Sequence, residues 1–338
     1  MQYATLGGTG LQISRLCLGS MVFGAAADET ASRDLVHRAL DLGVNFIDTA
    51  DCYNDGSAER FVGSALGGRR DDIVLASKGG RPIEGSPFPH PATRDHLVWA
   101  CEQSLRRLRT DRLDIYYLHW LPPEASLDGV LRGLEDLRQA GKALHIGCSN
   151  LLGWQIARAQ AAAGCGSSAF EVAQPLYNLT NRDAEVEVLP ACAELGVGVV
   201  SYSPLGRGVL TGKYMDGVPV QSRAGRGEPR IFETEYRPEA LEVARRLALR
   251  CRERRIPASQ FPIAWALANT AIDAVIVGPR SAAQLEDNCA ALDTVLTADD
   301  EAFVDSLVPP GGHADPAFRD PLFPVTGRRI RPVQPRPS

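Results

Sequence analysis

The feature that most constrains the fold of this chain is an alternation of short apolar runs with longer amphipathic stretches, which repeats eight times. The short runs are typical of buried strands. In the longer stretches, apolar residues recur at the i, i+3, i+4 and i+7 positions of one helix face. A strand followed by a helix, repeated eight times, is the pattern of a closed parallel barrel. The sequence therefore predicts a single-domain (β/α)8 TIM barrel of the α/β class.

The same pattern gives the expected bounds of these elements. Strands are expected at residues 13–18, 44–47, 73–76, 113–118, 144–146, 170–173, 197–200 and 274–277. Helices are expected at residues 32–42, 58–66, 94–108, 127–139, 154–162, 187–195, 238–255 and 281–291. Thr93 and Ser281 stand where helix N-caps are expected. Glycines that suit the left-handed position after a helix stand at Gly43, Gly67, Gly141, Gly164 and Gly196.

The segment before the first strand, YATLGGTGLQ, contains turn glycines and is expected to form a hairpin that closes the barrel floor. It lacks the GxGxxG spacing of a nucleotide-binding loop. The rival architecture, a doubly wound open sheet, requires that fingerprint after its first strand, so we favour the barrel. We expect the barrel at residues 1–308, a long functional loop at 206–237, and a Pro/Arg-rich tail at 309–338 that is disordered or forms a partial lid.

Composition excludes several classes of function. The net charge is −5 and no basic stripe is present, so we expect no nucleic-acid partner. No apolar run reaches the length of a membrane span, and the N-terminal residues lack the features of a signal peptide. The eight cysteines form no CxxC pair, which favours free thiols and a cytoplasmic location. The histidines show no metal-ligand spacing, so no metal is assigned.

Polar side chains follow seven of the eight predicted strands, at the ends where barrel enzymes place their chemistry. Three neighbouring strand ends carry Asp48, Lys78 and His119, and Tyr53 follows shortly after Asp48. An isolated tyrosine is a weak acid, with a pKa near 10. A nearby ammonium is expected to lower that pKa, a carboxylate to hold the ammonium, and a neutral imidazole to orient a carbonyl oxygen. Together these groups predict a proton donor for an oxygen that gains negative charge.

Eight segments, in order, carry a resemblance that covers roughly residues 3–295. They are LCLGSMVFG, GVNFIDTADCYNDGSAERFVGSAL, SKGG, LDIYYLHW, GCSN, AQPLYN, GVGVVSYSPLGRGVLTGKY and VIVGPRSAAQLEDN. The chain resembles the aldo/keto reductases, and is most similar to the branch that includes bacterial general reductases and potassium-channel β subunits. The resemblance implies an oxidoreductase that transfers hydride reversibly from NADPH to the carbonyl of an aldehyde or ketone.

The resemblance also implies roles for the strand-end residues. Tyr53 matches the proton donor, Lys78 and Asp48 match its charged partners, and His119 matches the carbonyl-orienting histidine. Channel β subunits have asparagine at the position of His119, so the histidine favours catalysis. The residues that match cofactor contacts are Ser20, Met21, Ser149, Asn150, Gln174, Tyr202, Ser203, Pro204, Leu205, Gly206, Arg207, Lys213, Arg223, Gly278, Arg280, Gln284, Asp287 and Asn288.

Several alternatives remain open from the sequence. Arg280 and Lys213 favour NADP(H) over NAD(H), since both are cations near the expected 2′-phosphate. Met21, Phe23 and Trp120 are candidates for the wall of a small-molecule substrate pocket. The alternatives to a general reductase are an NADP(H)-binding regulatory subunit and a dedicated biosynthetic ketoreductase acting on a sugar or secondary metabolite. Monomer and homo-oligomer are both compatible with the sequence.

Overall fold

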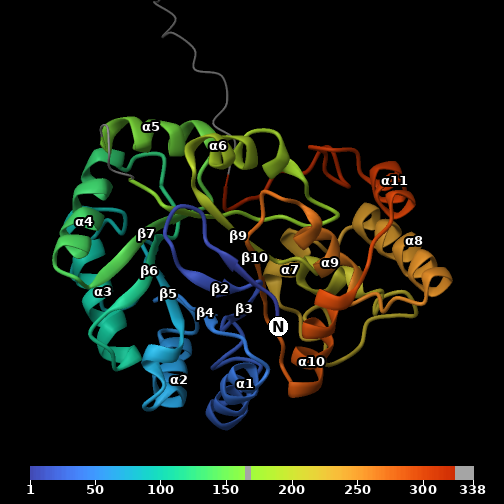
Figure 1. Ribbon diagram of the computed structural model, residues 1–338, viewed down its shortest axis with the longest axis horizontal. Helices are drawn as coiled ribbons and strands as arrows, with labels where there is room; N and C mark the ends of the chain where they lie inside the picture. The colour runs from blue at the N-terminus through green and yellow to red at the C-terminus, as the bar shows by residue number, and fades with distance from the viewer. Residues whose placement is uncertain (164–168, 324–338) are drawn as a thin grey trace, which may run out of the picture.

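The computed structural model describes residues 1–163 and 169–323, and it shows eight parallel strands closed into a barrel and surrounded by helices (Figure 1). The barrel strands are β3 (Leu16–Gly19), β4 (Phe46–Asp48), β5 (Val74–Gly79), β6 (Leu113–Leu118), β7 (Ala143–Ser149), β8 (Val172–Gln174), β9 (Gly198–Tyr202) and β10 (Ala274–Val277). They pair in chain order, and β10 closes the ring by pairing with both β3 and β9. The predicted TIM barrel is confirmed.

The predicted helices surround the barrel. They are α1 (Glu29–Asp41), α2 (Ser57–Leu66), α3 (Arg94–Leu108), α4 (Leu127–Gln139), α5 (Gly153–Ala163), α6 (Val188–Leu195), α8 (Pro238–Arg254) and α10 (Ala282–Ala290). Three helices were not predicted: α7 (Pro229–Glu233), α9 (Phe261–Ala268) and α11 (Ala298–Leu307). Short 3-10 turns are η1 (Arg70–Asp72), η2 (Asp183–Glu185), η3 (Gly206–Thr211) and η4 (Ala291–Asp293).

The predicted helix ends are present where the structure describes them. The side chains of Thr93 and Ser281 accept hydrogen bonds from the backbone N–H groups of His96 and Gln284, as N-caps do. The predicted C-terminal glycines have positive φ angles of 84° at Gly43, 51° at Gly67, 69° at Gly141 and 67° at Gly196. The fifth, Gly164, lies outside the described residues.

A hairpin closes the barrel floor, as predicted, through β1 (Tyr3–Thr5) and β2 (Gln12–Ser14). Its side chains Leu6 and Ile13 are fully buried in the barrel interior, beside Cys17 and Phe46. Other predicted strand bounds differ from the structure by a few residues, but the strand predicted at 13–18 combines parts of two elements, because Ile13 belongs to the hairpin and not to the first barrel strand. The break falls at Arg15, whose backbone pairs with residue 2 of the hairpin on one side and residue 275 of β10 on the other.

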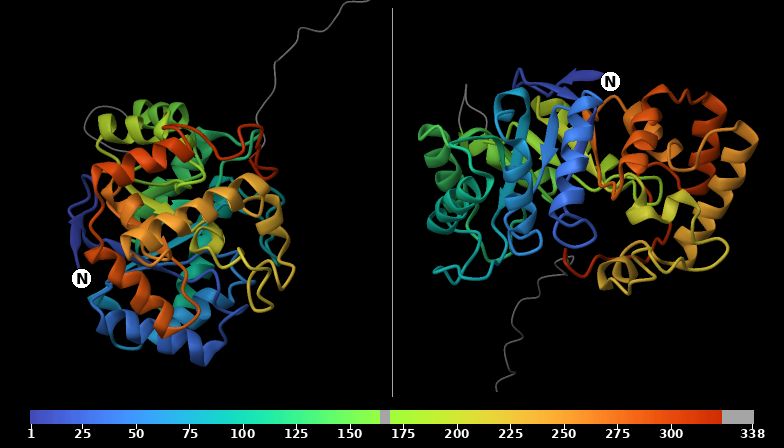
Figure 2. Two further views of the ribbon diagram at one scale, coloured as in Figure 1. Left: turned by 90° about the vertical axis from the view of Figure 1, so that its right-hand side faces the viewer. Right: turned by 90° about the horizontal axis from the view of Figure 1, so that it is seen from below.

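The opposite end of the barrel is covered by residues 206–237 and by the described part of the tail, as the right-hand view of Figure 2 shows. The loop forms its own small apolar cluster against α8, which includes Val209, Tyr214 and Ile231. Arg230 of this loop forms a salt bridge of 2.5 Å with Asp320 of the tail. Tail residues 324–338 lie outside the described part of the chain. Among the described residues, the structure contains no helix with the length and apolarity of a membrane span.

Candidate active site

A cavity of about 770 Å³ lies at the carboxyl ends of the barrel strands and extends beneath the 206–237 loop to α10. Asp48, Tyr53 and His119 line its inner end. The parallel register explains why they meet, since Gly19 of β3 pairs with Asp48, and Asp48 pairs with Ala76 of β5. Lys78 lies two residues beyond Ala76 and is fully buried, so it reaches the group from beneath the cavity wall.

Lys78 is the centre of this group. Its Nζ forms a buried salt bridge with Oδ1 of Asp48 and donates a hydrogen bond of 2.8 Å to the Thr49 carbonyl. It also donates to the Tyr53 hydroxyl over 3.3 Å. These contacts satisfy the three protons of an ammonium group. The predicted arrangement of carboxylate, ammonium and phenol is therefore present in one hydrogen-bonded chain.

The electrostatics of this chain differ from the prediction for Tyr53. Burial raises the pKa of Tyr53 above its ordinary value, and the opposing effect of Lys78 does not reverse this. Burial also acts to lower the pKa of Lys78, but Asp48 and Tyr53 outweigh it and the net shift is upward. The predicted net lowering of the Tyr53 pKa was thus wrong, because desolvation of the phenolate exceeds the attraction of one shared ammonium. Tyr53 is a neutral phenol near pH 7.

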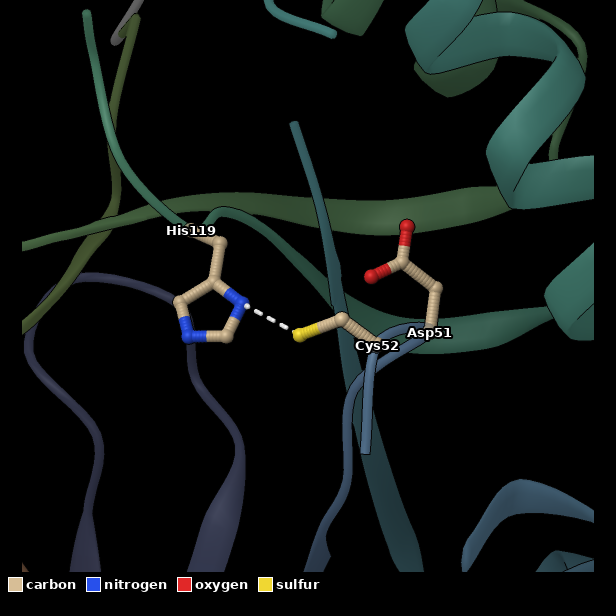
Figure 3. A group of neighbouring side chains, drawn as sticks. All are labelled: Asp51, Cys52 and His119. Carbon is tan, nitrogen blue, oxygen red and sulfur yellow. Dashed lines mark hydrogen bonds between the residues drawn. The ribbon is translucent and has the colours of Figure 1, made fainter. Parts of the chain in front are cut away.

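His119 lies beside Tyr53 with its ring edge-on, at a centroid separation of 5.9 Å. Burial, followed by the charges of Lys78 and Arg81, holds the pKa of His119 well below its ordinary value, so the imidazole is neutral. Its Nδ1 lies 3.7 Å from the Sγ of Cys52 (Figure 3). Burial, with Asp51 next, raises the pKa of the Cys52 thiol to about 12, so this contact joins two neutral groups.

A second set of polar residues crosses the barrel mouth. The Gln174 amide donates to Oδ2 of Asp48 over 2.8 Å, and the Ser149 hydroxyl donates to the Gln174 carbonyl over 2.8 Å. The Tyr202 hydroxyl donates to the Asn150 side chain over 2.8 Å. Asn150 and Ser203 have φ angles of 59° and 57°, a left-handed conformation that is unfavourable for most residues and often found at functional sites.

The cavity wall contains the residues that the resemblance assigns to the cofactor, with the exceptions of Ser20 and Gly206. Those in the wall are Met21, Ser149, Asn150, Gln174, Tyr202, Ser203, Pro204, Leu205, Arg207, Lys213, Arg223, Gly278, Arg280, Gln284, Asp287 and Asn288. Ser20 is fully buried beneath it. Gly206 begins η3 with a φ of 50° and is also buried.

The outer end of the cavity is strongly cationic, and its chemistry suits an anionic group. Lys213, Arg223 and Arg280 line it, and Glu228 pairs with Arg223 over 2.8 Å. Burial, then Arg280 and Arg223, lowers the pKa of Lys213 to about 8. Within the described chain Lys213 has no carboxylate within salt-bridge distance. A long cavity with an uncompensated cation at one end and polar amides at the other fits a phosphorylated dinucleotide.

The substrate end differs in part from the prediction. Met21 lines the cavity, but Phe23 is fully buried in the core, because the chain turns inward after Ser20 and the Phe23 backbone N–H bonds to the Ser20 carbonyl over 2.8 Å. Phe23 is therefore not part of the wall. Trp120 stands next to the wall, 6.4 Å from the Phe323 ring and 5.9 Å from the Arg81 guanidinium.

Sequence reasoning missed several residues at this end. Arg81 and the tail residues Leu322 and Phe323 line the cavity. The tail is far from the barrel strands in sequence, and its approach depends on contacts such as the Arg230–Asp320 salt bridge. Asp51 was also missed, although its position beside Cys52 in the NFIDTADCY segment could have indicated it. It is a buried carboxylate, and burial with nearby Glu59 raises its pKa to about 8.

Comparison with known proteins identifies the family of this chain. Residues 15–309 match the aldo/keto reductase family. An uncharacterized oxidoreductase of Bacillus subtilis is 36% identical, over 94% of this chain and 99% of the relative. A probable voltage-gated potassium channel subunit beta of Arabidopsis thaliana is 33% identical, over 87% and 92% of the two chains. The L-glyceraldehyde 3-phosphate reductase of Escherichia coli K12 is 29% identical, over 87% and 88%.

The chain therefore belongs to the aldo/keto reductase family. It is an oxidoreductase by family, and its fold is a TIM barrel. Members of this family generally use NAD(P)H. The predicted branch, with bacterial oxidoreductases and potassium-channel β subunits together, is confirmed.

Proposed function

We propose that this protein is an NADP(H)-dependent reductase of aldehydes or ketones, with Tyr53 as the proton donor. The observation that carries this proposal is the position of Lys78, which bonds Asp48 and Tyr53 at once beneath a cavity that His119 also lines. A buried ammonium in contact with a phenol stabilises negative charge as that phenol loses its proton. An Asp–Lys pair with a purely structural role would not need a phenol at the cavity wall, so the position of Tyr53 there favours a catalytic role.

The dinucleotide, when bound, supplies a hydride to the carbonyl carbon of the substrate. Tyr53 then protonates the carbonyl oxygen as negative charge develops there. Lys78 stabilises the phenolate that remains, and Asp48 keeps Lys78 charged and in place. The reverse reaction uses the same groups, with the phenolate accepting the proton of an alcohol.

His119 orients the carbonyl in this proposal. Its Nδ1 faces the Cys52 thiol, and the raised pKa of that thiol keeps it protonated as a donor. With Nδ1 accepting, the neutral ring carries its proton on Nε2. Nε2 can then donate to the carbonyl oxygen beside the Tyr53 hydroxyl. Cys52 is therefore a positioning residue that fixes the tautomer of His119.

The cavity would hold the dinucleotide with its reactive ring at the barrel mouth. Gln174, Ser149 and Asn150 present amide and hydroxyl groups there, and Tyr202 offers a ring for stacking. Lys213 and Arg280 would hold the 2′-phosphate at the outer end, which favours NADP(H) over NAD(H). A cytoplasmic location is part of this proposal, because the cysteines of the described chain are free thiols.

The preference for NADP(H) is tested by Arg280→Ala. Wild-type protein should bind NADPH at least about tenfold more tightly than NADH, which corresponds to about 1.4 kcal/mol. The variant should narrow this gap by weakening NADPH alone, since NADH has no 2′-phosphate. Fluorescence titration of both cofactors measures the effect. Equal affinities in the wild type, or an equal loss for both cofactors in the variant, would defeat the assignment.

A non-catalytic NADP(H)-binding regulatory subunit is the second candidate, because a plant relative carries the name of a potassium channel subunit. His119 and the open cavity beside Tyr53 favour catalysis. Steady-state assays with NADPH and a broad panel of aldehydes and ketones separate the two. Turnover supports the reductase, whereas tight cofactor binding without turnover on any member of the panel supports the regulator.

A further inference from the structure

Asp51, Cys52 and His119 bring three potential metal-ligating atoms together at the inner end of the cavity (Figure 3). One carboxylate oxygen, the thiol sulfur and an imidazole nitrogen all lie within 4.8 Å of one another. Cys52 and His119 line the cavity, so an ion could reach them from solvent through it. None of the roles proposed above requires Asp51.

The spacing of sulfur and nitrogen suits zinc. Zinc binds thiolate at about 2.3 Å and imidazole at about 2.0–2.1 Å in a tetrahedral arrangement, which places the two ligand atoms about 3.6 Å apart. The Cys52 Sγ and His119 Nδ1 are 3.7 Å apart. The two strongest ligands are therefore already at the required separation. Only the carboxylate has to move, by a rotation of its side chain.

Asp51 provides an independent indication of a ligand. It is 2% exposed, and within the described structure no side chain donates a hydrogen bond to either carboxylate oxygen, while the Cys52 backbone N–H lies close but outside good hydrogen-bond geometry. Buried carboxylates normally have such partners or bind metal ions. Figure 3 shows one of its oxygens turned toward the Cys52–His119 pair. An ion between the three side chains would supply the missing partner.

The charges also balance. A thiolate and a carboxylate neutralise the two positive charges of the ion, and the imidazole is already neutral. Lys78 is nearby, but its ammonium is engaged by Asp48. Arg81 faces Cys52. Arg107 faces Asp51 but is paired with Glu59. The neutral sum of ion and ligands limits repulsion from these cations.

We propose that Asp51, Cys52 and His119 form a binding site for Zn²⁺ or a similar thiophilic divalent ion, and that its occupation inhibits the enzyme. Binding breaks the Cys52 S–H bond and, near pH 7, the O–H bond of the Asp51 carboxyl, whose pKa is about 8. Metal–sulfur and metal–oxygen bonds form, and both protons pass to solvent without any change of oxidation state. Coordination through Nδ1 would replace the Cys52 thiol as the partner of that nitrogen and hold the His119 ring on the ion, so that Nε2 could no longer adjust to the substrate carbonyl. The inhibitory effect rests on the proposed reductase function, whereas the metal binding does not.

The binding is tested on the full-length protein without cofactor by titration with Co²⁺, whose thiolate complexes absorb through sulfur-to-metal charge transfer. We expect this band to saturate at one equivalent and to disappear when Zn²⁺ is added. Cys52→Ala should abolish the band. Asp51→Asn should weaken Zn²⁺ binding by about tenfold or more, since even outer-shell partners of a metal contribute that much. Cys289→Ala is the matched control, because Cys289 is also a partly exposed free thiol and lies on α10.

The inhibition is tested by NADPH-dependent reduction with and without Zn²⁺, each variant being compared with its own uninhibited rate. Wild type and Cys289→Ala should be inhibited and recover with a chelator, while Cys52→Ala should be at least about tenfold less sensitive. If Cys52→Ala fails to fold, Cys52→Ser replaces it at nearly the same volume.

A wild-type protein without a thiolate band, or a Cys52 variant with unchanged Zn²⁺ affinity, overturns the site. Zn²⁺ binding through Cys52 without any loss of rate overturns the inhibitory role. If the protein reduces no carbonyl at all, the Co²⁺ titration still decides the metal site, so failure of the proposed function is a separate result.

Discussion

Single residues at the two ends of the cavity are placed in environments that oppose their ordinary charge states. Lys78 keeps its charge because a buried carboxylate compensates it, and the net effect raises its pKa. Lys213 is partly buried among other cations, so its pKa falls to about 8. The first arrangement suits a permanent catalytic cation. The second suits a site that is completed only when an anion binds.

Lys213→Met should stabilise the cofactor-free protein near pH 7. The folded-state pKa of about 8 lies below the ordinary value of 10.5, so the unfolded chain binds more protons between these values. Stability of the wild type should therefore rise with pH across that window. Removing the charge should add about 1 kcal/mol at pH 7, allowing for solvent screening, and should weaken NADPH binding.

Thermal melts of both proteins between pH 7 and pH 10, with and without NADPH, measure this. Lys142→Met is the control, because Lys142 is also partly buried but is paired with a carboxylate, that of Glu102. A variant less stable than wild type at pH 7 and equally stable at pH 10 would contradict the cause given for the Lys213 shift.

Tyr202 is expected to contribute a stacking surface rather than a hydrogen bond. Tyr202→Ala should weaken NADPH binding by about 1–2 kcal/mol, the range of an aromatic contact with its buried area. Tyr202→Phe keeps the ring and loses only the hydroxyl bond to Asn150, so its affinity should remain near wild type. Cofactor titration distinguishes the two. Unchanged affinity in both variants, with lower stability, would leave Tyr202 a packing residue.

At the scale of elements, the repeated strand–helix pattern predicted the barrel because each element has one buried face with the correct period. Two of the three unpredicted helices, α9 and α11, lack that signal for physical reasons. Helix α9 is buried on nearly every side, so its apolar residues show no helical period. Helix α11 has a capping box between Thr297 and Asp300, but few apolar residues follow it. The boundary at Ile13 was missed because hairpin and barrel strand are separated by a single residue.

The hairpin is expected to stabilise the barrel without taking part in catalysis. Leu6→Ala should lower the free energy of unfolding by about 2–5 kcal/mol, since Leu6 is fully buried at the floor of the barrel interior. The cavity is at the other end, so NADPH affinity should not change. Chemical denaturation and cofactor titration of the same preparation test both statements. A loss of affinity in folded protein would show that the floor influences the site.

At the scale of the whole molecule, the part of the site that lies on the ends of the barrel strands was predictable from the sequence. Asp48, Lys78 and His119 follow strands whose ends must meet, so their proximity follows from the fold. A partial lid was one of two expectations for the tail, but the particular residues that reach the cavity, Leu322 and Phe323, were not predictable, because loop contacts with no periodic signal bring them there. The Asp51–Cys52–His119 group was missed for a similar reason. Asp51 and Cys52 lie in the turn after β4, whereas His119 follows β6, and no regular spacing in sequence connects them.

The most direct test of the proposed chemistry is the rate of Tyr53→Phe with its best carbonyl substrate, measured together with its NADPH affinity. The substitution preserves the ring and removes only the proton donor, so kcat should fall by about 10²-fold or more, while NADPH binds as in the wild type. Lys78→Met should behave similarly, since the phenolate would lose its stabilising cation. A Tyr53→Phe protein with intact NADPH binding and a rate close to wild type would show that the proton comes from elsewhere.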